Sequence, residues 1–151
     1  MLSKKLLNLY QEIVSQTSQM VNTHVDTTDI TGLVDYASIY AQSPEEFEII
    51  TKELQNNGSV AIEQPSGNYY SLTDPLETSQ GTIKYCRVRK YDTDHPERGY
   101  ADFEVVDYPI FKEKYLSEQY FSLLDREEEM IELRDPKFNV RAYFLSGQFY
   151  L

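Results

Sequence analysis

Residues 33–40 read LVDYASIY, and the segment Ser43-Pro44-Glu45-Glu46 follows them almost directly. In LVDYASIY the odd-numbered residues would face one side of the chain and the even-numbered residues the other, which is the two-residue period of a β-strand. In the second segment, a capping serine, a proline in the first turn and a glutamate three residues after the serine mark the start of a helix. An apolar stripe of Phe47, Ile50 and Leu54 continues that helix. The stretch therefore predicts a strand followed at once by a helix.

Three β-rich runs separated by turn residues follow the helix, namely 59–64, 69–73 and 82–90. The resulting βαβββ order then recurs. Residues 101–108 indicate a strand, 109–119 a short helix, and three further runs follow at 120–124, 128–133 and 138–145. Apolar residues spaced three and four apart predict an amphipathic helix at the N-terminus.

We therefore predict one α+β domain over residues 1–151, in which two tandem βαβββ modules form a curved mixed sheet. The expected parts are an N-terminal helix (1–22), a first module (33–91) and a second module (99–146).

Each module has an Asp-Pro pair at the same place, where its third strand is expected to close: Leu72-Thr73-Asp74-Pro75 and Leu133-Arg134-Asp135-Pro136. This arrangement resembles the vicinal-oxygen-chelate (glyoxalase/dioxygenase-like) superfamily. The segments that resemble its YecM-like branch more closely are Asp35-Tyr36-Ala37-Ser38-Ile39, Leu72–Pro75 and Gly99–Val105. The resemblance covers residues 33–107 and implies helices outside a concave cup, which holds a divalent metal in active members.

The overall charge argues against several kinds of partner. The chain has 151 residues, with 14 basic and 25 acidic side chains and a net charge of −11, so its field repels nucleic acid and anionic lipid. No apolar run approaches the ~18 residues of a membrane span. Cys86 is the only cysteine and is expected to be an inert core thiol. We expect a cytoplasmic protein without nucleic-acid or membrane partners.

Alternation along the predicted strands separates a face of small apolar side chains from a face of tyrosine, arginine and acidic side chains. If the modules curve into a cup, the second face lines it and forms a ligand site. The expected ligand-binding residues are Tyr36, Tyr85, Arg87, Arg89, Asp102, Glu104, Arg141 and Tyr143. The alternative is a solvated face with cross-strand ion pairs. The 13 tyrosines favour a half-polar cavity, but they would equally suit a protein interface.

The resemblance also places the superfamily's metal-ligand positions at Tyr36, Arg87, Asp102 and the 142–143 region. Only Asp102 is a plausible ligand there, because a guanidinium offers no lone pair. We expect no cofactor, although a carboxylate site for a divalent cation built from Asp102, Glu104 and Glu132 is left open.

The leading hypothesis is a small-molecule-binding protein with a degenerate metal site, whose arginines clamp an anionic organic ligand. The alternatives are a divalent-metal-dependent enzyme of the same superfamily and a regulatory protein-interaction module; a homodimer is also left open. The sequence identifies no catalytic residue. His24 and His95 lie in turn-rich stretches and are expected at the surface.

Overall fold

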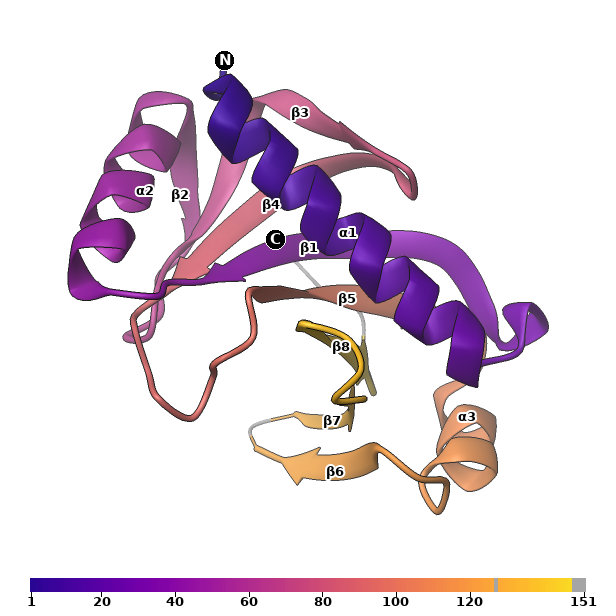
Figure 1. Ribbon diagram of the computed structural model, residues 1–151. Helices are drawn as coiled ribbons and strands as arrows, with labels where there is room; N and C mark the ends of the chain where they lie inside the picture. The colour runs from indigo at the N-terminus through magenta and orange to yellow at the C-terminus, as the bar shows by residue number, and fades with distance from the viewer. Residues whose placement is uncertain (127, 148–151) are drawn as a thin grey trace.

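A computed structural model describes residues 1–126 and 128–147 (Figure 1). The helices found there are α1 (Lys4–His24), α2 (Pro44–Asn56) and α3 (Tyr108–Tyr115), with one 3₁₀ turn, η1 (Thr27–Asp29). The strands are β1 (Ile30–Tyr40), β2 (Gly58–Ile62), β3 (Tyr69–Thr78), β4 (Gly81–Arg89), β5 (Gly99–Val105), β6 (Phe121–Asp125), β7 (Glu129–Leu133) and β8 (Val140–Leu145). No helix of this part of the chain is long and apolar enough to cross a membrane.

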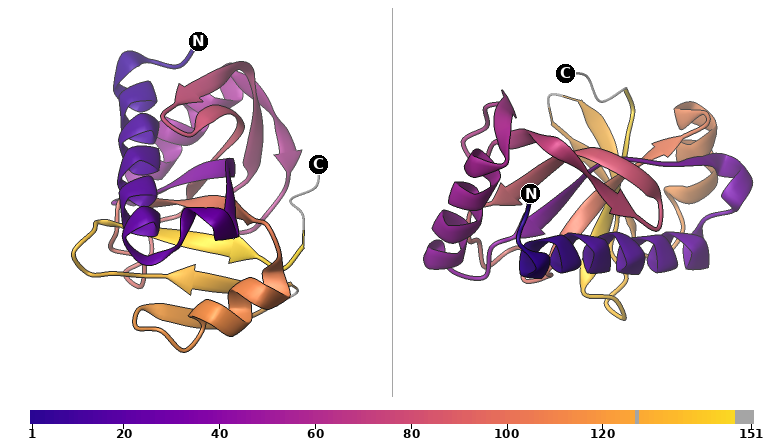
Figure 2. Two further views of the ribbon diagram at one scale, coloured as in Figure 1. Left: turned by 90° about the vertical axis from the view of Figure 1, so that its right-hand side faces the viewer. Right: turned by 90° about the horizontal axis from the view of Figure 1, so that it is seen from above.

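All eight strands belong to one mixed sheet, with the order β2-β3-β4-β1-β5-β8-β7-β6. Within each half, the first strand pairs in parallel with the last: β1 with β4, and β5 with β8. The two halves meet through the antiparallel pair β1 and β5, so the same strand order is read outward from the centre in both directions. The predicted fold class, two βαβββ modules in a curved mixed sheet with an extra N-terminal helix, is confirmed (Figure 2).

The three helices cover the apolar face of the sheet. Helix α1 begins at Ser3, whose hydroxyl accepts a hydrogen bond from the amide of Leu6 (3.2 Å). Its buried side chains pack against strands of both modules, so α1 bridges the halves (Figure 1). The apolar side chains that alternate along the central strands form the core beneath the helices, as parity predicted: Ala37, Ile39, Cys86, Val88, Ala101, Phe103, Ala142 and Phe144.

The two Asp-Pro pairs lie in different settings. Asp135 and Pro136 follow the end of β7, as expected. Asp74 and Pro75 instead lie inside β3, which continues to Thr78, so the prediction that this pair closes the third strand was wrong. The register shifts here, between Ser71 and Leu76. Because a bulge leaves ladder positions unpaired, the strand tolerates a proline that has no N–H to donate.

A second bulge lies in β1 and brings two acidic side chains together. Val34 pairs with Phe103 and Tyr36 pairs with Asp102, so Asp35 and Tyr36 both lie opposite Asp102. Asp102 is completely buried. Its carboxyl oxygens accept no hydrogen bond from an amide, hydroxyl or basic side chain of the described residues. Burial and the neighbouring Asp35 raise the pKa of Asp102, and burial followed by repulsion from Glu104 raises that of Asp35 to about 6.

Gly99→Ala tests how closely the central strands and α1 approach one another. A β-carbon at Gly99 would meet the Ser38 carbonyl oxygen on β1 and the Ile13 side chain on α1. We expect a loss of about 2 kcal/mol in the free energy of unfolding, measured by urea denaturation. Ser59→Ala, at an exposed position on β2, is the control and should change stability little. A stable Gly99→Ala protein would contradict the described packing.

Asp35→Asn tests the acidic pair. The pKa of Asp35 in the folded protein lies above the ~3.9 expected of the unfolded chain, so its contribution to stability is lost as pH rises from about 4 to 6. The variant lacks this loss. We therefore expect its free energy of unfolding, relative to that of the parent, to rise by about 1 kcal/mol between pH 4.5 and 7, measured by urea denaturation at each pH. The exposed Glu113→Gln variant should show no such trend, and a parallel pH profile for Asp35→Asn would refute the pairing.

Candidate functional site

A cluster of tyrosines occupies the face of the sheet opposite the helices. Tyr36 and Tyr40 come from β1, Tyr100 from β5 and Tyr143 from β8, and none is more than 6% exposed. Tyr100 is central, because the ring centroids of Tyr36, Tyr40 and Tyr143 lie 5.6, 5.2 and 4.9 Å from its own. These distances are typical of interacting aromatic rings. The curvature of the sheet therefore buries this face, and the tyrosines are not a solvated surface.

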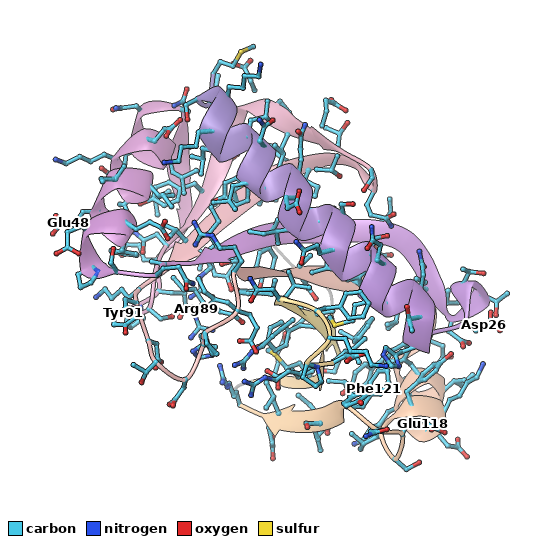
Figure 3. All side chains as sticks on the ribbon, viewed as in Figure 1. Asp26, Glu48, Arg89, Tyr91, Glu118 and Phe121 are labelled. Atoms are coloured by element: carbon cyan, nitrogen blue, oxygen red, sulfur yellow. The ribbon has the colours of Figure 1, made fainter. Side chains whose placement is uncertain are left out.

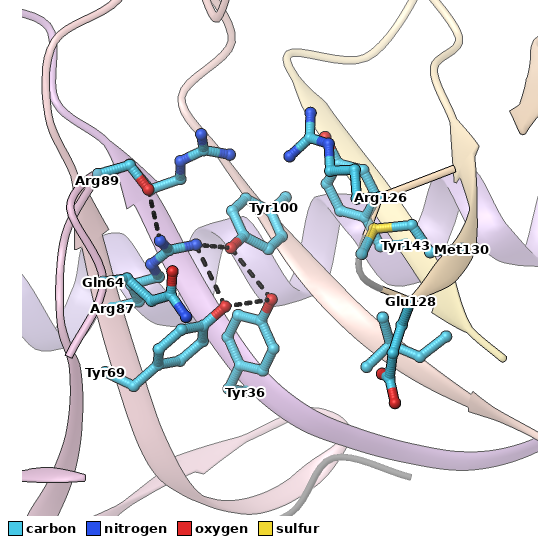
Figure 4. A pocket seen from close by; sticks show the side chains of 12 residues that line it. Tyr36, Gln64, Tyr69, Arg87, Arg89, Tyr100, Arg126, Glu128, Met130 and Tyr143 are labelled. Atoms are coloured by element: carbon cyan, nitrogen blue, oxygen red, sulfur yellow. Dashed lines mark hydrogen bonds between the residues drawn. The ribbon is translucent and has the colours of Figure 1, made fainter. Parts of the chain in front are cut away.

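Arg87 extends from β4 into this cluster and is 6% exposed. Its Nη1 donates to the hydroxyls of Tyr69 (3.2 Å) and Tyr100 (3.0 Å). Its Nε donates to the carbonyl of Gly67 (2.9 Å), and its Nη2 to the Ser66 hydroxyl (2.7 Å). The guanidinium carbon also lies 4.4 Å from the centre of the Tyr69 ring (Figure 4). All of these partners are neutral, and Arg87 forms no ion pair within the described part of the chain.

The phenol groups beside Arg87 form a hydrogen-bonded ring with it. The hydroxyls of Tyr36 and Tyr100 lie 3.1 Å apart, and Tyr69 donates to the Tyr36 hydroxyl (3.3 Å). Burial raises the pKa of Tyr36 well above its usual value and raises that of Tyr69 to about 12. The phenols of Tyr36 and Tyr69 are therefore neutral near pH 7, so they solvate the guanidinium without cancelling its charge.

A cavity of about 590 Å³ opens between the two modules on this face. Its lining comes from both halves of the chain: Tyr36, Gln64, Ser66, Tyr69, Arg87, Arg89, Tyr100, Arg126, Glu128, Met130, Tyr143 and Leu145. Arg87 and Arg89 lie on one wall, and Arg126 and Glu128 lie across from them (Figure 4). With three arginines and one glutamate, the lining is cationic in a protein whose net charge is −11.

Four of the residues predicted for the site line this cavity: Tyr36, Arg87, Arg89 and Tyr143. Tyr85 packs against the tyrosine cluster without lining the cavity. Arg141 lies in an adjacent cavity, bound to Glu97 (2.9 Å) and Glu132 (3.2 Å). The structure therefore brings the predicted residues to one face but divides them between two cavities.

The two acidic residues predicted on β5 take other positions. Asp102 is fully buried next to Asp35, while Glu104 is exposed. Neither of them lines the cavity.

Sequence reasoning missed several lining residues, and only some of them left a signal. Tyr100 lies two residues before Asp102 on the same strand, so parity could have assigned it to the cup. Tyr69 could be found in the same way on β3. Ser66 lies in the loop between β2 and β3, and Arg126 follows β6; a loop has no periodic pattern from which a direction can be inferred.

The residues present do not fit a divalent cation. The positions carried over from the superfamily hold the phenols of Tyr36 and Tyr143, the guanidinium of Arg87 and the carboxyl of Asp102, whose raised pKa favours its neutral form. Ala142 faces the core. Of the alternative ligands, Glu132 is already bound to Tyr143 (2.7 Å) and Arg141. No group of three or more His, Cys, Asp or Glu residues within 1–126 and 128–147 is arranged to hold a metal ion.

Comparison with known proteins extends the description of the fold. No protein-family model matches the chain, and no curated protein matches its sequence. Among solved structures, a structural-genomics target named Protein EC4020 is similar with a TM-score of 0.67 at 9% identity, over 98% of this chain and 93% of that one.

Two further structures are similar at TM-scores below 0.5. A glyoxalase/bleomycin resistance protein/dioxygenase superfamily member from Vibrio splendidus 12B01 has a TM-score of 0.49 at 10% identity, covering 74% of this chain and 96% of its own. Methylmalonyl-CoA epimerase from Mycobacterium tuberculosis has a TM-score of 0.43 at 14% identity, covering 80% and 91%. The decisive feature is the strand order itself, with parallel first and last strands in each module and first strands paired at the centre. This chain therefore shares its fold with Protein EC4020 and has the two paired βαβββ modules that its sequence predicted.

Proposed function

We propose that this protein binds a small organic anion in the cavity between its two modules, with Arg87 as the main contact for the anionic group. The observation that carries the proposal is the burial of Arg87 among neutral partners. A guanidinium has five N–H groups, and the four hydrogen bonds described above leave one Nη2 hydrogen for a ligand. Because an uncompensated buried charge is costly, an anion beside Arg87 would be stabilised.

The surroundings of Arg87 also suit an organic molecule. A volume of about 590 Å³ is within the usual range of small-molecule pockets, roughly 300–1,000 Å³. Tyrosine rings and the Met130 side chain supply apolar contact area, and neutral hydroxyls supply hydrogen bonds. The anion is therefore more than an inorganic ion: its carbon skeleton would pack against the aromatic walls.

The proposal includes a degenerate metal site. At the positions where the resemblance places metal ligands, this chain has phenols and a guanidinium, which favour an anion over a cation. The chemistry of this donor set supports the binding hypothesis over the metal-dependent enzyme. The binding step needs only the chain's own residues.

Benzoate, a monoanion with a ring that can pack between the tyrosines, is a suitable probe. We expect isothermal titration calorimetry to detect binding of benzoate to the parent protein. The affinity for benzoate should fall at least tenfold in Arg87→Gln. Arg87→Lys keeps the charge but not the planar fork, so it should retain part of the affinity. Lys52→Gln, on the exposed side of α2, is the control. If benzoate binds Arg87→Gln as tightly as the parent, Arg87 is not the anion contact.

A further inference from the structure

From the groups around Tyr40 we infer that the bound molecule carries a second anionic group, held by Arg89, His95, Arg126 and Arg141. We call these four residues and Tyr40 the Tyr40 subsite. The inference rests on the proposed function, because it assumes a first anionic group beside Arg87. It narrows the ligand from an organic anion to an organic dianion.

Basic side chains from three separate elements converge on the ring of Tyr40, which is 1% exposed. The His95 ring, from the loop between β4 and β5, lies 4.8 Å away at an angle of 32°. The guanidinium carbons of Arg89 on β4 and Arg141 on β8 are each 5.8 Å from its centroid. Arg89 lies where β4 ends and this loop begins (Figure 3). Two arginines and a histidine thus surround the buried ring of Tyr40.

The positive charge at this subsite is only partly compensated. Arg141 is paired with Glu97 and Glu132, and Glu97 also accepts a hydrogen bond from Arg134 (2.8 Å). By contrast, the side chains of Arg89 and Arg126 form no hydrogen bond or ion pair within residues 1–126 and 128–147, although Arg89 lies over the Tyr40 ring. Positive charges held close together favour a bound anion.

The pKa of His95 depends on this positive charge. Its Nδ1 lies 3.3 Å from Asp92, and its side chain is 13% exposed, which corrects the expectation of a surface position. Burial, followed by Arg89 and Arg141, holds the pKa of His95 below its usual value, and Asp92 opposes them. The other charged groups around the adjoining cavity are Asp94, Arg126, Glu132 and Arg134. An anion at the subsite would offset the two arginines and raise the pKa of His95.

The Tyr40 subsite adjoins the cavity beside Arg87. Arg126 lines both the 590 Å³ cavity and the adjoining one of about 540 Å³, which His95 and Arg141 line. Arg89 and Arg126 lie toward one end of the first cavity, while Glu128 lies toward the other (Figure 4). Glu128 also raises the pKa of the buried Asp102, so that end is acidic. Both anionic groups should therefore face the arginine end.

Strand geometry sets the spacing of the two anionic groups. Arg87 and Arg89 are two residues apart on β4, so their α-carbons are separated by about 7 Å and their side chains point to the same face. A matching dianion carries its charges about 7 Å apart on a planar or extended skeleton. A para-substituted aromatic dicarboxylate has this shape, and terephthalate differs from benzoate only by the second carboxylate.

Calorimetric titrations of benzoate and terephthalate therefore test the inference. We expect terephthalate to bind the parent at least tenfold more tightly than benzoate. Arg89→Gln should reduce the ratio of the terephthalate affinity to the benzoate affinity to about one, because the variant lacks the guanidinium that faces the second carboxylate. His95→Gln should remove part of the gain. Lys52→Gln is again the control, and thermal melts check that each variant is folded.

Proton NMR of the two histidines provides an independent measurement. Terephthalate should raise the pKa of His95, whereas benzoate should leave it unchanged. His24, the last residue of α1, is hydrogen-bonded to Asp135 and is the internal control. Its signal should not respond to either acid.

The outcomes separate the two proposals. If benzoate binds through Arg87 while terephthalate binds no more tightly and the His95 signal does not move, the Tyr40 subsite is refuted and the proposed function stands. If terephthalate is favoured but Arg89→Gln keeps the full gain, the second carboxylate lies elsewhere and the subsite is likewise refuted. If neither acid binds the parent protein, both proposals fail.

Discussion

The antiparallel pairing of β1 with β5 is the interaction on which the rest of the structure depends. It joins the two modules into one sheet and sets Ala37 opposite Ala101 and Ile39 opposite Gly99. The small residues Ala37, Ala101 and Gly99 allow α1 to lie close to the centre of the sheet. On the other face, the same pairing places Tyr36 opposite Asp102 and Tyr100 among the remaining tyrosines. The register of β1 with β5 thus positions both the core on one face of the sheet and the cavity on the other.

Much of this arrangement can be predicted from sequence, because it follows from local patterns. Alternation along 33–40 and 101–106 gives both the strands and the face to which each side chain points. What failed depends on pairing between distant segments. Asp35 reaches the side of Asp102 because β1 has a bulge, and Pro75 lies within a strand because β3 has another. His95 is held by contacts with Tyr40 and Asp92, and no pattern in its own loop indicates them.

The cup of this chain holds positive charge at positions where the resemblance implies ligands for a cation. Where the superfamily resemblance implies metal ligands, this chain places an arginine within a ring of phenols. The carboxyl that remains, Asp102, is paired with another acid and withdrawn from the cavity. Tyrosine is well suited to this exchange, since its hydroxyl satisfies a guanidinium while its ring keeps the wall apolar.

Helix α1 limits how the cup can respond to a ligand. Since it packs on strands of both modules, it restricts a hinge motion of the halves about the β1–β5 pair. The Tyr10 hydroxyl on α1 also donates to the carbonyl of Arg87 (2.8 Å), so the helix holds the backbone of the strand that carries Arg87. Under the proposed function, a cavity held in this way would lose little conformational entropy on binding and would select ligands by the dimensions it already has.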